Sequence, residues 1–111
     1  MKIPLSTIVP IPSSHSSGQK RILITRQSIQ SGITQIAVTK LKKSEKIQLH
    51  VHPTMEEFFI VRNGHLLITV GEDEHDCVTD DFVYVPAGVE HSLEPIEDTE
   101  LLTIGCALSQ K

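Results

Sequence analysis

The side chains best suited to metal chemistry are two histidines that stand two residues apart, His50 and His52. They belong to an alternating run, residues 48–52, and in a β-strand every second side chain points to the same face. On this pattern Gln48, His50 and His52 share one face of a strand. Two neutral imidazoles side by side make a poor core but good ligands for a metal ion.

A carboxylate follows in the next apolar run, where two adjacent glutamates compete for the role. The Asn63-Gly64 pair between two apolar runs predicts a β-hairpin with a type I′ turn. Alternation back from that turn places Glu57 on the same face as Phe59, whereas Glu56 begins the opposite face. A carboxylate among apolar neighbours requires a compensating cation, so the pattern selects Glu57.

The spacing of these residues is His-x-His-x4-Glu-x6-Gly, and Pro-x-Gly-x2-His follows at residues 86–91. The two patterns resemble the paired motifs of the cupin superfamily and cover roughly residues 44–95. The resemblance implies a small single-domain cupin: an all-β double-stranded β-helix, or jelly roll, with a metal ion near its axis. Carried over residue by residue, the ligands that it implies are His50, His52, Glu57 and His91.

Three positions depart from the family's motifs. Ser44 stands where the first motif has its leading glycine, Asp80 where the second opens with glycine, and Pro95 where it closes with asparagine. None of the three is a ligand, so the departures concern turn geometry rather than metal binding.

Three imidazoles and one carboxylate suit a divalent transition metal, Fe, Mn, Ni, Cu or Zn, better than Ca or Mg. Four protein ligands would leave one or two positions for water or substrate on an octahedral ion. The alternative is a scaffold that has kept its strands and no longer binds metal. Intrinsic affinity does not choose among these metals, because cells control metal supply.

Two polar side chains are candidates for catalysis beside the metal. Gln48 shares the predicted face of His50, and Tyr84 precedes the Pro86 turn. Lys46 has the same parity as Gln48 and would bring a positive charge to the pocket mouth if it turns inward. We predict a pocket walled by Gln48, Phe59, Ile68 and Tyr84.

The bulk properties of the 111 residues agree with one domain whose core forms without disulfides. No apolar run approaches the ~20 residues that span a bilayer, and residues 1–5 lack the features of a signal peptide. We therefore expect no membrane association. Cys77 and Cys106 form no C-x-x-C pair, which favours a reduced, cytoplasmic setting.

Charge is divided unevenly along the chain. Residues 1–49 carry eight Lys or Arg and one acidic residue, whereas residues 50–111 carry two Lys or Arg and thirteen acidic residues. We interpret the division as complementarity within the fold or across a homodimer, and expect no nucleic-acid binding.

The order of elements is that of an all-β protein. Residues 1–19 form an arm, with an edge strand near Ile8-Val9, and residues 20–111 form the single cupin domain. The predicted strands include residues 20–26, 33–41, 81–85 and 101–108, and residues 71–76 are expected to form an acidic loop.

The face opposite Glu57 carries Phe58, Ile60 and Leu67, too many apolar side chains to leave in water. The arm, another strand or a second subunit must cover them, and we expect a homodimer.

The jelly roll hosts many chemistries, so three function classes stay open. The first is a metal-dependent enzyme that isomerises or epimerises a small polar metabolite, as the family's sugar-phosphate isomerases do. The second is an Fe(II) dioxygenase, and the third is a non-catalytic module that holds a small molecule at the metal.

Overall fold

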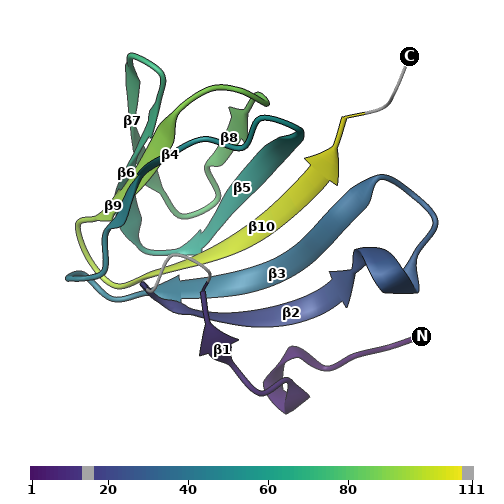
Figure 1. Ribbon diagram of the computed structural model, residues 1–111. Helices are drawn as coiled ribbons and strands as arrows, with labels where there is room; N and C mark the ends of the chain where they lie inside the picture. Colours follow the sequence, from purple (N-terminus) through teal and green to yellow (C-terminus); the bar gives the residue numbers. More distant parts are fainter. Residues whose placement is uncertain (14–16, 109–111) are drawn as a thin grey trace.

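The computed structural model describes residues 1–13 and 17–108, which form two antiparallel β-sheets (Figure 1). The larger sheet has the strand order β1-β2-β3-β10-β5-β8 and the smaller sheet β4-β9-β6-β7. Two single-turn 3₁₀ segments, η1 (Leu5–Thr7) and η2 (Arg26–Ser28), accompany them. The strands are β1 (Ile11–Pro12), β2 (Gln19–Thr25), β3 (Ile33–Leu41), β4 (Ile47–His50), β5 (Met55–Asn63), β6 (His65–Val70), β7 (Asp73–Val78), β8 (Phe82–Val85), β9 (His91–Pro95) and β10 (Thr99–Ala107).

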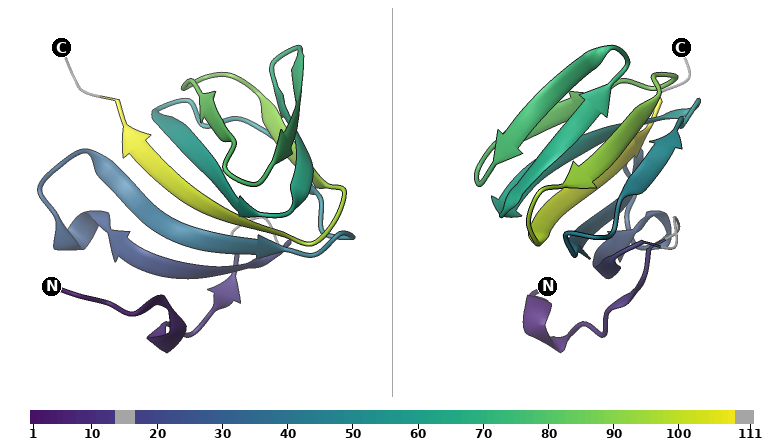
Figure 2. Two further views of the ribbon diagram at one scale, coloured as in Figure 1. Left: turned by 180° about the vertical axis from the view of Figure 1, so that it is seen from behind. Right: turned by 90° about the vertical axis from the view of Figure 1, so that its left-hand side faces the viewer.

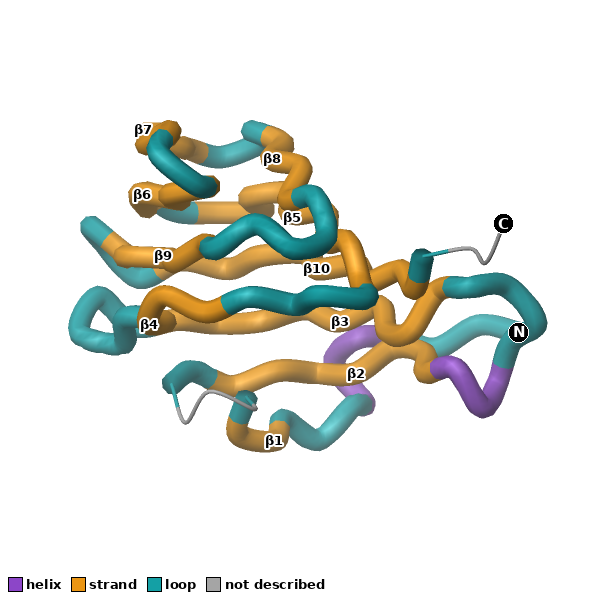
Figure 3. The backbone as a smooth tube through the Cα atoms, turned by 45° about the horizontal axis from the view of Figure 1, so that its top comes forward, coloured by secondary structure: helices purple, strands orange, loops and turns teal. Residues whose placement is uncertain are grey.

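The two sheets pack face to face as a jelly roll, which confirms the predicted all-β class (Figure 2). Strands β1 and β2 continue the larger sheet past the edge of the smaller one (Figure 3). Both inner faces contribute to one core, whose most deeply buried aliphatic side chains are Leu41, Val61, Leu66, Ile68, Val85 and Leu101. The part of the chain that the structure describes contains no helix able to span a membrane.

Strand positions were predicted well where the apolar pattern alternates. The strand at residues 33–41 has the predicted bounds, and those predicted at 20–26, 81–85 and 101–108 differ from β2, β8 and β10 by one or two residues. Phe59 and Val61 on β5 and Leu66 and Ile68 on β6 are buried, as the parity of the pattern indicated. Alternation of side chains is a local property of extended backbone, so the sequence contains it.

The predicted hairpin between β5 and β6 is wrong. β5 pairs with β10 and β8, β6 pairs with β7 and β9, and the chain passes from one sheet to the other at Gly64. Gly64 has a φ of +120°, while Asn63 lacks the positive φ that a type I′ turn requires. A Cβ on Gly64 would lie 2.6 Å from the Asp98 carbonyl oxygen, so glycine serves a close backbone approach here.

Two smaller predictions also need correction. Residues 73–76 of the acidic loop expected at 71–76 belong instead to β7 (Asp73–Val78), the edge strand of the smaller sheet, where exposed charges such as Glu74 discourage pairing with another chain. The edge strand expected near Ile8-Val9 lies instead at Ile11–Pro12, where Pro12 is tolerated because β1 is outermost. Residues 14–16, between β1 and β2 in the chain, lie outside the described ranges.

Candidate metal centre

The structure brings together the four side chains that the motifs single out. His50 ends β4, His52 lies in the following loop, Glu57 lies on β5, and His91 begins β9. His50 and His91 are directly paired neighbours in the smaller sheet, with ring centroids 4.2 Å apart. The ring centroids of His52 lie 4.9 Å from His50 and 5.4 Å from His91. Three separate segments therefore meet at one point between the sheets.

A β-bulge in β4 sets the direction of His50. Ile47 pairs with Leu93 and His50 with His91, so three residues of β4 span the distance that two span on β9. Ile47 and His50 therefore both face inward, and Gln48 is exposed. Simple alternation placed Gln48 beside His50, and the extra residue in the strand makes that placement wrong.

Backbone carbonyl groups hold two of the imidazoles in one tautomer. Nδ1–H of His50 donates to the Gln48 carbonyl oxygen at 2.7 Å, and Nδ1–H of His91 donates to the Val89 carbonyl oxygen at 3.0 Å. In its neutral form each ring would then present the Nε2 lone pair to a metal ion in the cluster. Backbone carbonyls commonly orient histidine ligands of metal ions in this way.

Glu57 provides the negative charge at the centre. Its Oε1 lies 3.0 Å from Nε2 of His91 and 3.1 Å from Nε2 of His52. Burial raises the pKa of the Glu57 carboxyl, but the hydrogen bond from His91 and the charges of the imidazoles outweigh it, so the pKa lies below its usual value. Burial lowers the pKa of His91, yet its bonds to Glu57 and to Val89 raise it overall. A cation, either a proton or a metal ion, is required between the carboxylate oxygen and these nitrogens.

The residues present fit a transition-metal ion. One ligand atom from each of the four lies within 4.8 Å of the others. Two ligands about 2.1 Å from a common ion are at most about 4.2 Å apart, so a contraction of a few tenths of an ångström would complete the set. His91 is 1 % exposed, so water has little access to its imidazole, and its partners must come from the cluster. The cluster could thus hold a metal ion.

At Asp80, one of the three departures from the motifs, the turn geometry is kept. Asp80 has a φ of +74° and is the single non-glycine residue with positive φ in the described ranges. It takes the left-handed conformation that the motif's glycine adopts easily, and aspartate is among the residues that tolerate it. At the Pro86 turn, Gly88 has a φ of +79° and its N–H donates to the His52 carbonyl oxygen at 2.9 Å, which ties the turn to the His52 loop.

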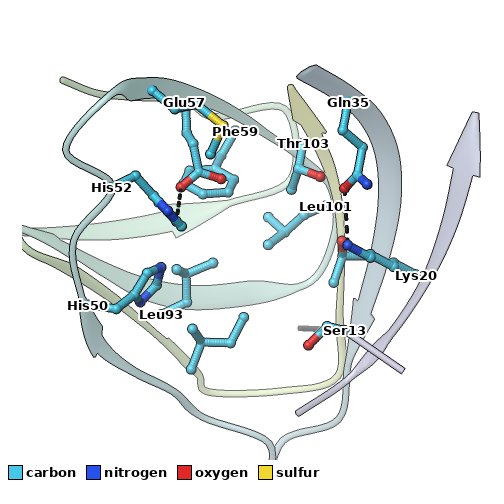
Figure 4. A pocket seen from close by; sticks show the side chains of 13 residues that line it. Ser13, Lys20, Gln35, His50, His52, Glu57, Phe59, Leu93, Leu101 and Thr103 are labelled. Atoms are coloured by element: carbon cyan, nitrogen blue, oxygen red, sulfur yellow. Dashed lines mark hydrogen bonds and ion pairs between the residues drawn. The ribbon is translucent and has the colours of Figure 1, made fainter. Parts of the chain in front are cut away.

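A pocket of about 140 Å³ begins at this cluster and crosses the inner face of the larger sheet (Figure 4). His50, His52 and Glu57 line one end, and Lys20, Gln35 and Thr103 line the other. An adjoining hollow of about 240 Å³ shares Gln35, Met55, Glu57 and Thr103 with it. The remaining lining residues are Ser13, Thr39, Ile47, Phe59, Leu93 and Leu101.

Of the four predicted walls, the structure brings only Phe59 to this pocket. Ile68 is fully buried in the core. Tyr84 lies on the outer face of β8, 44 % exposed, where its hydroxyl donates to Glu56 at 2.8 Å. That hydrogen bond raises the pKa of Tyr84. The prediction of Tyr84 as a cavity residue was made without knowing which strand β8 pairs with. Tyr84 pairs with Phe58 of β5, and both side chains lie on the outer face of the sheet.

Lys46 does not turn inward, and the positive charge of the pocket comes from Lys20. Lys46 is exposed, and its Nζ lies 3.8 Å from a Glu94 carboxylate oxygen. Lys20 of β2 enters the pocket instead, and Nζ donates to Oε1 of Gln35 at 3.1 Å. The sequence analysis missed Lys20 and Gln35, because nothing in the sequence distinguishes them from other strand residues. Only alternation within β3 indicates that Gln35 shares the inner face with Ala37 and Thr39.

A family model described as "Cupin domain" matches residues 37–105, which include all four cluster residues. The chain is 26 % identical over 93 residues to the tetracenomycin polyketide synthase protein TcmJ of Streptomyces glaucescens, covering 84 % of this chain and 61 % of that protein. It spans less than two thirds of the length of the curated relatives it matches.

Solved structures share the architecture at low sequence identity. A predicted oxalate decarboxylase from Thermotoga maritima superposes with a TM-score of 0.89 at 21 % identity, covering 97 % of this chain and all of that chain. The cupin domain of Schizosaccharomyces pombe Cnp3 superposes with a TM-score of 0.80 at 14 % identity, covering 96 % of this chain and 74 % of that chain. These likenesses concern the fold alone.

Proposed function

The chain belongs to the cupin family, and we propose that it is a metal-dependent cupin that binds and transforms a small polar metabolite between its two sheets. The observation that carries the proposal is the position of the cluster at one end of a pocket, which His50, His52 and Glu57 line. A metal that serves only as a structural staple has no need of an adjoining cavity.

His50, His52, Glu57 and His91 would hold the ion. A divalent transition metal bound there supplies Lewis acidity, which polarises a carbonyl or hydroxyl oxygen of the substrate. The protein's own contribution is orientation: carbonyl groups fix the tautomers of His50 and His91, and Phe59, Leu93 and Leu101 form an apolar wall that limits access of water. This arrangement suits isomerisation or epimerisation of a polar metabolite.

A non-catalytic binding role is the second candidate, because the pocket has few groups that could move a proton. Outside the cluster, Lys20 is the one titratable side chain among the described lining residues. A module that only holds its ligand needs no such group.

Elemental analysis of protein purified without chelator tests the proposal. We expect about one transition-metal ion per chain, and a marked loss of metal in His52→Ala with the fold retained, because the apolar core does not include His52. Equal metal content in wild type and His52→Ala would refute the site. The metal-loaded protein is then incubated with candidate metabolites, and binding without turnover would favour the second candidate.

A further inference from the structure

The end of the pocket opposite the cluster has its own chemistry. Lys20 lies on β2, is paired with Thr39 of β3, and extends across the inner face to Gln35 (Figure 4). The two side chains are linked by a hydrogen bond of 3.1 Å and both line the pocket. A cation therefore stands inside the jelly roll, on a different sheet from two of the histidines.

Lys20 differs from the lysines on the surface. Lys40 lies 3.8 Å from Glu100, and Lys46 lies 3.8 Å from Glu94. No carboxylate of the described residues lies within 4.0 Å of the Lys20 ammonium, whose partner is a neutral amide. A half-buried ammonium that lacks a counter-charge is partly desolvated at a cost, and an anion beside it would offset that cost.

Neighbouring groups extend this preference for an anion. Lysine can only donate, so the Gln35 oxygen must face Lys20 and the Gln35 amide N–H groups remain as donors for a ligand. The Thr103 hydroxyl donates to the Ala37 carbonyl oxygen at 3.2 Å, so the donors for an anion at this end are Lys20 and Gln35. Between this end and the cluster the wall is apolar, with Phe59, Leu93 and Leu101.

We propose that the pocket takes a short organic acid with oxygen groups at both ends, whose carboxylate is bound by Lys20 and Gln35. The second oxygen group, another carboxylate, a hydroxyl or a carbonyl, lies at the metal end, and this part rests on the proposed function. The pocket of about 140 Å³ and the adjoining hollow of about 240 Å³ together lie near the lower end of the roughly 300–1,000 Å³ of small-molecule sites, which favours a short chain.

A carboxylate fits the Lys20 end better than a phosphate. Proteins commonly bind phosphates with arginine forks or rows of backbone N–H groups at a helix N-terminus. This end offers one ammonium and one amide, without arginine among the described lining residues. The structure thus favours an organic acid over a sugar phosphate.

Calorimetric titration of the zinc-loaded protein with malonate, succinate and glutarate tests the proposal, with propionate as the acid that has only one oxygen group. We expect the best dicarboxylate to bind more tightly than propionate. Lys20→Met should weaken that binding at least about tenfold, as for loss of a charged hydrogen bond. Gln35→Glu should weaken it as well, because the new carboxylate would neutralise Lys20. Lys20→Arg should retain most of the affinity.

Lys40→Met is the matched control, since Lys40 lies on the same sheet, is exposed and pairs with Glu100. It should leave binding unchanged. Wild-type affinity in both Lys20→Met and Gln35→Glu would overturn the proposal, and so would a dicarboxylate that binds no better than propionate. Zinc content measured on the same samples reports on the proposed function separately. If the chain holds no metal, the proposed function fails, whereas weak dicarboxylate binding that disappears in Lys20→Met would still support the anion site.

Discussion

Strand β5 carries a glutamate and a phenylalanine on each of its two faces. On the inner face Glu57 lies between His52 and His91, and Phe59 is 4 % exposed in the core. On the outer face Glu56 accepts a hydrogen bond from Tyr84, and Phe58 packs against Tyr84 and Phe82 with ring centroids 5.4 Å and 6.4 Å away.

The comparison shows that residue type does not decide the role of these side chains. Glu57 has three imidazoles around it and a lowered pKa, whereas Glu56 has a phenol hydroxyl at the surface. The difference between them is one position along an extended strand, which reverses the direction of the side chain. The same substitution made at Phe59 and Phe58, or at Glu57 and Glu56, can therefore test the role assigned to each face.

The phenylalanines should show the largest difference. Phe59→Ala removes a fully packed ring from the core and should lower the free energy of unfolding by about 3–5 kcal/mol. Phe58→Ala, on the half-buried outer face, should cost about 1–2 kcal/mol. Denaturant unfolding of the two variants measures both. Equal losses would mean that the outer face is as well covered as the core.

The glutamates should differ in metal binding. Glu57→Gln removes the only carboxylate of the cluster and should weaken metal binding more than about 100-fold, beyond the usual loss for a residue that merely orients a ligand. Glu56→Gln should leave metal affinity unchanged. Competition with a chromogenic chelator gives both affinities, and circular dichroism confirms the fold. Similar affinities for the two variants would contradict the site.

The outer face should also report on assembly. Phe82 is 58 % exposed and Tyr84 44 % exposed beside Phe58 and Ile60, so we propose that a second copy of the chain covers this face. Phe82→Asp should then weaken a dimer at least about tenfold, while metal content stays the same. Light scattering at micromolar concentration measures the mass. A strictly monomeric wild type would rule out this dimer.

The smallest effect concerns proton binding in the metal-free protein. The pKa of His91 is raised above 6.5, so its interaction with Glu57 stabilises the fold fully below pH 6.5 and is lost as the pH rises through the raised pKa. Glu57→Gln should return the pKa of His91 towards or below its usual value, and Glu56→Gln should not. Titration of the His91 ring followed by NMR tests this. An unchanged His91 titration in Glu57→Gln would show that Glu57 is not its partner.

The same proton competes with the metal. Because His91 must lose its proton to become a ligand, metal affinity should fall as the pH drops through the raised pKa of His91, beginning above pH 6.5. Glu57 stays ionised over that range, since its pKa is lowered from 4.5.

The sequence by itself determined the properties that depend on neighbours along the chain. Alternation identified the inner face of β5 and β6, including Glu57, Phe59 and Ile68, and it gave β3 its bounds. The motif spacing named all four members of the cluster before their arrangement was known. These predictions succeed because a strand points its side chains alternately whichever strand it pairs with.

Only the tertiary structure decided which strands pair and where alternation breaks. The Asn63-Gly64 pair looks the same in a hairpin and at a crossing between sheets, and the close approach of Asp98 distinguishes the two. The bulge in β4 turned Gln48 outward because its register is set by β9, more than forty residues away. Lys20 became the cation of the pocket because β2 extends the larger sheet past the edge of the smaller one. Each of these outcomes depends on partners distant in the chain, so no local pattern in the sequence could contain it.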